Sequence, residues 1–219
     1  FLVFNYQWPR IYKNLGFKAG ISLIHYSNAN VKAPNTSTNT FAFNAGLTYS
    51  LSGNGDTEFI TIEKPAIKES VRMNLVFRTG LNESDVINTG QYPFYIFSAY
   101  ADKRLGKSSA IQLGTDVFYS NFLKELIRFQ SVSFPEIEVD PATDFKRVGM
   151  FVGHELFIHK LSVITQLGYY IYYPFDFEGR VYNRVGVKRY FGDKWFAALS
   201  LKSHAAKAEA VELGIGIRL

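Results

Sequence analysis

The sequence predicts an all-β fold, an antiparallel transmembrane outer-membrane β-barrel with about ten strands in this chain and more in a longer full-length protein. Three observations predict it. Apolar and polar residues alternate along most of the chain, glycines recur on the polar side of that alternation, and the alternating segments are long. A tilted strand needs about 9–11 residues to cross a bilayer, whereas ordinary strands average near 5–6. Residues 1–219 are therefore expected to form a single barrel domain.

The strands are expected in chain order where the alternation is strict. In the first, residues 17–27, Phe17, Ile21 and Leu23 share one side of the chain, and in the next, residues 41–51, Phe41 and Phe43 begin the apolar side. The same period of two returns near residues 71–80, 111–119, 147–155, 161–171, 181–188, 195–204 and 211–219. Residues 91–103 complete the ten strands in a register that the pattern leaves open. The segments 52–68, 82–91 and 122–144 are expected to be long loops, with a helical turn within residues 121–130.

The glycines indicate which side of the strands faces inward. They stand on the polar side, beside charged residues, at Gly20, Gly46, Gly80, Gly114, Gly149, Gly153, Gly168, Gly186, Gly214 and Gly216. Inside a small closed barrel a glycine makes room for long charged side chains that pair across the lumen. We therefore expect an inverted barrel, apolar outside, with these side chains pointing inward: Arg72, Asp116, Arg184, Lys188 and Glu212. Aromatic clusters at residues 92–95, 169–173 and 190–191 are expected to form interfacial girdles.

The amino-acid composition excludes several classes of function. The chain has no cysteine, which excludes disulfides and thiol-based metal or redox sites. Its net charge is +5, but the basic residues are dispersed and many lie on the presumed inner side, so no nucleic-acid partner is expected. His154 and His159 lack ligand spacing, and the acidic stretch 136–144 lacks a calcium-loop pattern. No metal and no cofactor are expected.

His25 and Ser27 form the candidate reactive pair. They stand two positions apart on one expected strand, so their side chains share a face with Cα atoms about 6.6 Å apart. Both extend the apolar stripe of Phe17, Ile21 and Leu23. A catalytic base and nucleophile fit this arrangement, and so does an inert polar pair at the lipid head-group level. His204 shares a side with Lys202, which favours a hydrogen-bonding role in the lumen over chemistry.

The sequence resembles a known enzyme family at several places. The residues that carry the resemblance are His-Tyr-Ser-Asn at 25–28, Lys-Ala-Pro-Asn at 32–35, Leu-Gly-Tyr-Tyr at 167–170, and the ending at 201–207 and 212–216. Together they resemble the outer-membrane lipid A 3-O-deacylases and, more closely, their longer relatives among the acyloxyacyl hydrolases of the Bacteroidota. Because those relatives are longer at the amino end, we expect residues 17–27 to pair on their other side with a segment absent from this sequence or with another protein.

The resemblance implies a membrane-embedded serine esterase of the bacterial outer membrane that removes an acyl chain from lipid A. His25 would accept the proton of Ser27, whose oxygen attacks the acyl ester, and Asn28 would stabilise the oxyanion. The acyl chain would lie on the stripe formed by Phe17, Ile21, Leu23, Phe41 and Phe43. No enclosed pocket is required.

Two positions depart from the family pattern. Asn39 stands where the family has a Glu fourteen residues after the histidine, and Asn30 replaces a glycine. An Asn can orient the imidazole but supplies no negative charge. The alternative is therefore a catalytically weakened or inactive barrel that serves as a structural or accessory subunit of an outer-membrane protein complex. A small solute channel is disfavoured, because lumenal charges would plug the barrel, and the acyl position and partner proteins stay open.

Overall fold

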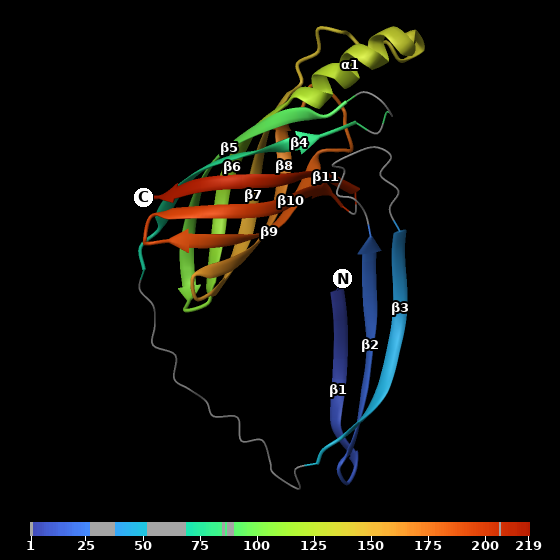
Figure 1. Ribbon diagram of the computed structural model, residues 1–219, viewed down its shortest axis with the longest axis vertical. Helices are drawn as coiled ribbons and strands as arrows, with labels where there is room; N and C mark the ends of the chain where they lie inside the picture. The colour runs from blue at the N-terminus through green and yellow to red at the C-terminus, as the bar shows by residue number, and fades with distance from the viewer. Residues whose placement is uncertain (1, 27–37, 52–68, 85, 87–89, 206) are drawn as a thin grey trace. The chain divides into compact units, whose positions relative to one another are not determined.

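The structure is a computed structural model of the 219-residue chain and describes residues 2–26, 38–51, 69–84, 86, 90–205 and 207–219. These residues form the strands β1 (Leu2–Tyr12), β2 (Leu15–Tyr26), β3 (Thr38–Tyr49), β4 (Arg72–Asn82), β5 (Tyr92–Gly106), β6 (Ser109–Ser120), β7 (Lys146–Ile158), β8 (Leu161–Tyr172), β9 (Val181–Phe191), β10 (Trp195–His204) and β11 (Lys207–Arg218). They also form the helix α1 (Asn121–Ser133) and the 3₁₀ helix η1 (Pro135–Ile137). The strands belong to two compact units, β1–β3 and β4–β11 (Figure 1).

The first unit is an antiparallel sheet in the order β1-β2-β3. β2 pairs with β1 through Phe4 opposite Ile21, so the expectation of a partner from outside this sequence at that edge is wrong. β1 was not expected from the sequence, because Pro9 interrupts it. Proline has no N–H for the ladder, and the register of the pair shifts between Trp8 and Tyr12.

The second unit is a closed antiparallel barrel of eight strands, in the order β10-β11-β4-β5-β6-β7-β8-β9. Pairing of β11 with β4, with Ile215 opposite Phe77, closes it. The all-β barrel class is thus confirmed. The described residues form eleven strands where ten were expected, because β1 was not foreseen, and eight of the eleven close a barrel among themselves. That residues 1–219 form one barrel stays a prediction.

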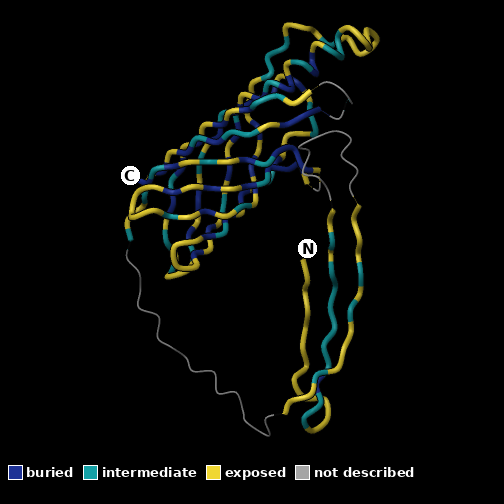
Figure 2. Tube along the Cα trace, viewed as in Figure 1, coloured by how far each residue is buried: buried dark blue, intermediate teal, exposed yellow. Residues whose placement is uncertain are grey.

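The barrel of β4–β11 is apolar outside and polar inside, as predicted. Figure 2 shows buried and exposed residues alternating along its strands. Leu113, Leu167 and Leu213 are about 60 % exposed, whereas Asp116, Arg184 and Glu212 are fully buried. An outward apolar belt is what a barrel in a bilayer requires. Among the described residues, no helix is both long and apolar enough to cross a membrane.

The glycines on the inner side make room for aromatic rings rather than mainly for charged side chains. A Cβ added at Gly168 would lie 2.1 Å from Cζ of Tyr182, and one added at Gly216 would lie 2.2 Å from Cζ of Phe196. Tyr170 is also fully buried and stacks on Tyr182 with ring centroids 4.8 Å apart. That aromatic residues form interfacial girdles stays a prediction, but Phe94 and Tyr170, two of the expected members, are buried inside the barrel. Aromatic residues of one parity face outward, and those of the other parity fill the lumen.

Ion pairs fill the rest of the lumen. Arg184 joins Glu212 at 2.6 Å and Asp116 at 2.9 Å. Lys188 joins Glu155 at 2.8 Å. Glu209 accepts hydrogen bonds from several neighbours, namely Arg147 at 2.5 Å, Lys202 at 2.6 Å and His204 at 2.6 Å. His204 therefore has the lumenal hydrogen-bonding role expected of it, and these buried side chains leave the interior packed.

Helix α1 lies beyond one end of the barrel (Figure 1). It is longer than the expected helical turn, because Phe122, Leu123, Leu126 and Ile127 recur at helical spacing and bury one side of it against Phe175 from the β8–β9 connection.

Candidate active site

The structure brings two of the predicted site residues together on the first unit. His25, near the end of β2, is directly opposite Asn39 in β3. The Nδ1 atom of His25 lies 2.6 Å from Oδ1 of Asn39, which is hydrogen-bond distance. Both residues are exposed. The spacing of fourteen residues in the sequence therefore corresponds to a direct cross-strand contact.

This contact determines which ring nitrogen of His25 is free. An amide oxygen only accepts hydrogen bonds, so with this orientation of the Asn39 amide the Nδ1 atom of His25 is the donor. In a neutral imidazole the other nitrogen, Nε2, then has a lone pair available. A histidine held this way can accept a proton from a hydroxyl group, which is the task of a general base.

Ser27, Asn28 and Asn30 lie outside the described residues. The predicted nucleophile and oxyanion residue therefore stay predictions, with the sequence placing Ser27 two positions after His25.

The predicted acyl-binding residues share one face of the β1–β3 sheet. Ile21 is opposite Phe43, and Leu23 is opposite Phe41. Phe41 and Phe43 meet edge to face with ring centroids 5.1 Å apart, and Phe43 is 82 % exposed. Phe17 stands at the far end of the same side of β2. By strand alternation, His25 and Asn39 lie on this face too.

β1 contributes a part of this face that was not expected from the sequence. Its members are exposed and apolar or aromatic: Leu2, Phe4, Tyr6 and Trp8. They pair in order with Leu23, Ile21, Ala19 and Phe17. Their alternation with Val3, Asn5 and Gln7 is the signal that could have found them. The three strands together present one continuous apolar face next to His25.

A second serine–histidine contact occurs on the closed barrel. The Nε2 atom of His154 in β7 lies 2.7 Å from Oγ of Ser109 in β6. Both follow the outward parity of Ile111 and Val152. Nothing in the sequence predicts this pair, because it depends on the register between β6 and β7. It belongs to the second unit, whereas His25 and Asn39 belong to the first.

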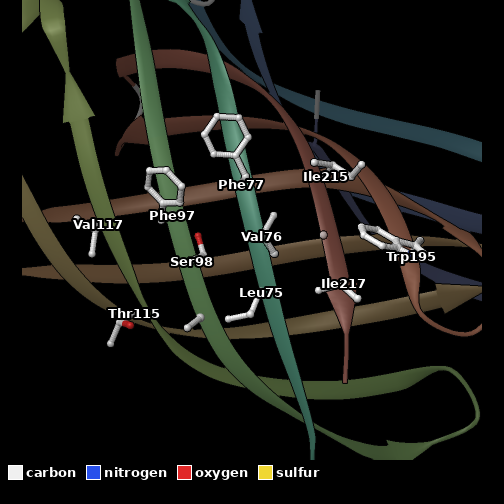
Figure 3. A pocket seen from close by; sticks show the side chains of 12 residues that line it. Leu75, Val76, Phe77, Phe97, Ser98, Thr115, Val117, Trp195, Ile215 and Ile217 are labelled. Carbon is white, nitrogen blue, oxygen red and sulfur yellow. The ribbon is translucent and has the colours of Figure 1, made fainter.

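The barrel also has an apolar groove of about 460 Å³ on its outer surface. Figure 3 shows its lining side chains, with Phe77 and Phe97 toward one side of the groove and Trp195 and Ile217 toward the other. Because it faces outward, the groove exposes apolar surface of the kind that lipid chains cover.

Within the described ranges, no cluster of three or more histidine, aspartate and glutamate side chains could hold a metal ion.

Two known protein families match this chain, one over each unit. The family described as acyloxyacyl hydrolase, C-terminal domain, matches residues 71–219. The family described as lipid A 3-O-deacylase (PagL) matches residues 5–48. Searches of curated proteins and of solved structures returned no match. The first match covers the eight-stranded barrel, and the second covers β1–β3 almost entirely, including His25 and Asn39.

Proposed function

This chain belongs to the PagL-like family of lipid A deacylases and acyloxyacyl hydrolases, and on that premise we propose that it is an outer-membrane serine esterase that removes an acyl chain from lipid A. His25 is the general base, Ser27 the nucleophile and Asn28 the oxyanion residue, while Asn39 orients His25. The observation that carries the proposal is the 2.6 Å contact between His25 and Asn39, which lies within the segment matched by the deacylase family.

The reaction follows from the protonation state of His25. Its Nε2 atom takes the proton of the Ser27 hydroxyl as the serine oxygen attacks the carbonyl carbon of an acyl ester. The negative charge that develops on the carbonyl oxygen is stabilised by the Asn28 side chain. The ester C–O bond then breaks, and the departing alkoxide oxygen of lipid A takes the proton back from His25. Water releases the acyl group from Ser27 as a free fatty acid by the same steps in reverse order.

The chemistry of lipid A is consistent with a site on an exposed apolar face. The acyl chains of lipid A already lie in the bilayer, so a chain can lie on Phe41, Phe43 and Leu23 without leaving the apolar phase. Binding then requires little new burial of apolar surface, and the ester at the top of the chain comes near the level of His25.

The identity of residue 39 determines the turnover that we expect of the enzyme. In a serine protease, replacing the orienting aspartate by asparagine lowered turnover about 10⁴-fold with the histidine in the wrong tautomer. Here the amide oxygen of Asn39 faces Nδ1, which supports the tautomer with a free lone pair on Nε2, so we expect the loss to come from the missing charge. This missing charge is also what favours the second candidate function, an accessory barrel with little or no activity in an outer-membrane protein complex.

Mass spectrometry of lipid A tests the proposal. The purified full chain in detergent should release fatty acid from lipid A of its own host, and Ser27→Ala should abolish the release. Ser109→Ala is the matched control, because it removes the other serine that contacts a histidine and should leave the release unchanged. If the wild type removes no acyl chain, the esterase proposal is wrong and the accessory-barrel function is favoured.

A further inference from the structure

We propose that the lumen mouth at the tight-turn end of the eight-stranded barrel is a binding site for a phosphate-bearing anion. A cavity of about 360 Å³ opens there, at the end where short turns join β5 to β6, β7 to β8 and β9 to β10. It is lined by Arg72, Arg104, Phe157, His159, Lys160, Tyr190, Gly192, Asp193 and Arg218. The volume lies within the usual range for small-ligand pockets.

The floor of the cavity is formed by Arg218, whose charge is paired with Asp102 and whose orientation is fixed by its neighbours. Arg218 donates hydrogen bonds to Asp102 and to the Tyr190 hydroxyl, both at 2.9 Å. Phe157 and Tyr190 stack with ring centroids 6.0 Å apart. These contacts fix the Arg218 guanidinium against two rings, so its orientation is set before any ligand arrives.

The walls carry two cations that no carboxylate neutralises. Arg104 and Lys160 form no ion pair with any residue in the described part of the chain, in contrast to Arg72, which is 3.3 Å from Glu69. Arg104 lies over the Phe157 ring, with its Cζ 3.3 Å from the ring centroid, and its Nε atom is buried without a hydrogen-bond partner. One NH group of Arg104 donates to the carbonyl of Lys107 at 2.8 Å.

This arrangement of cations fits a ligand that carries a phosphate group better than a ligand that carries a single carboxylate group. A guanidinium offers several N–H groups in a planar fork that matches phosphate oxygens, and Lys160 adds a mobile ammonium group. Asp193 is the only carboxylate among the described lining residues and opposes an anion. The shared chemistry is therefore a phosphate group, supplied either by a lipid head group at the membrane surface or by a free anion.

The test uses the full chain in a nonionic detergent. Inorganic phosphate is titrated by calorimetry in one arm, and short-chain phosphatidylglycerol is added and detected by native mass spectrometry in the other. Lys160→Gln should weaken binding about ten-fold, since one charge-assisted contact is lost, and Arg104→Gln should act similarly. Asp193→Asn should strengthen binding. Lys194→Gln, at the same end but outside the cavity lining, should have little effect.

The two arms separate the sources of the phosphate group. Binding of phosphate that Lys160→Gln weakens indicates a free anion, and binding of phosphatidylglycerol alone with the same sensitivity indicates a lipid head group. Lys160 is exposed, so its variant tests the site even if Arg104→Gln impairs folding. Equal binding by wild type, Lys160→Gln and Lys194→Gln in both arms, or no binding in either, would overturn the proposal.

Discussion

Asn39 is the residue at which this chain differs most informatively from the family pattern that it resembles. The amide oxygen of Asn39 lies 2.6 Å from Nδ1 of His25, and in the proposed mechanism it orients the imidazole as a carboxylate would, without the charge. A hydrogen bond to a charged group contributes about 1 kcal/mol more than one to a neutral group. The cost of the substitution is therefore expected to be moderate.

Replacing Asn39 tests this estimate. Asn39→Glu should raise the rate of acyl release roughly five- to ten-fold, because it adds charge behind a histidine that is already oriented. Asn39→Leu should lower the rate by roughly 10²-fold, because it leaves His25 without an orienting acceptor. Initial rates of fatty-acid release at saturating lipid A measure both. A lower rate for Asn39→Glu than for the wild type would contradict the orientation argument.

At the scale of the strand, alternation predicted most of the fold. The inward direction of Asp116, Arg184 and Glu212 followed from strand alternation, which places successive side chains on opposite faces, together with the glycines on the polar side. The identity of neighbouring strands did not follow. The closure of β11 onto β4 and the contact of Ser109 with His154 depend on register, which alternation within one strand does not contain.

The inner glycines also illustrate what the sequence could predict and what only the structure shows. Their presence on the polar parity predicted close packing inside, but only the structure identifies the Tyr182 ring as the neighbour of Gly168. Gly168→Val should destabilise the barrel by about 1–3 kcal/mol, because its Cβ would overlap a buried ring that has no room to move. Gly106→Ala is the control, since a Cβ there meets nothing within 4 Å.

Denaturant unfolding in detergent micelles, followed by tryptophan fluorescence, measures both glycine variants. Equal unfolding midpoints for Gly168→Val and the wild type would show that Tyr182 does not pack against this strand.

At the scale of the whole molecule, the described residues form a closed barrel with a packed interior and a separate three-stranded sheet that presents the candidate site.

The ion pair of Arg184 with Glu212 is fully buried. Removing one member of a buried pair leaves an uncompensated charge. Glu212→Gln should therefore destabilise the barrel by about 3–5 kcal/mol, whereas Glu125→Gln on the surface of α1 should change its stability by less than about 0.5 kcal/mol.

The packed lumen also predicts the electrical behaviour of the barrel. Aromatic rings and ion pairs occupy the interior from Arg218 at one end to Arg147 near the other. The full chain in a planar lipid bilayer should show no steady ion conductance. Sustained, reproducible single-channel currents would mean that the lumenal side chains do not fill the barrel.

The central claim is that Ser27, activated by His25, is a nucleophile on a lipid-facing surface. A fluorophosphonate probe tests it most directly, because an activated serine oxygen displaces fluoride and keeps the phosphonyl group. Peptide mass spectrometry of the labelled wild type should find the adduct on Ser27 and none on Ser109, and His25→Ala should lose the label. A wild-type protein that carries the adduct on Ser109, or carries none at all, would contradict the account.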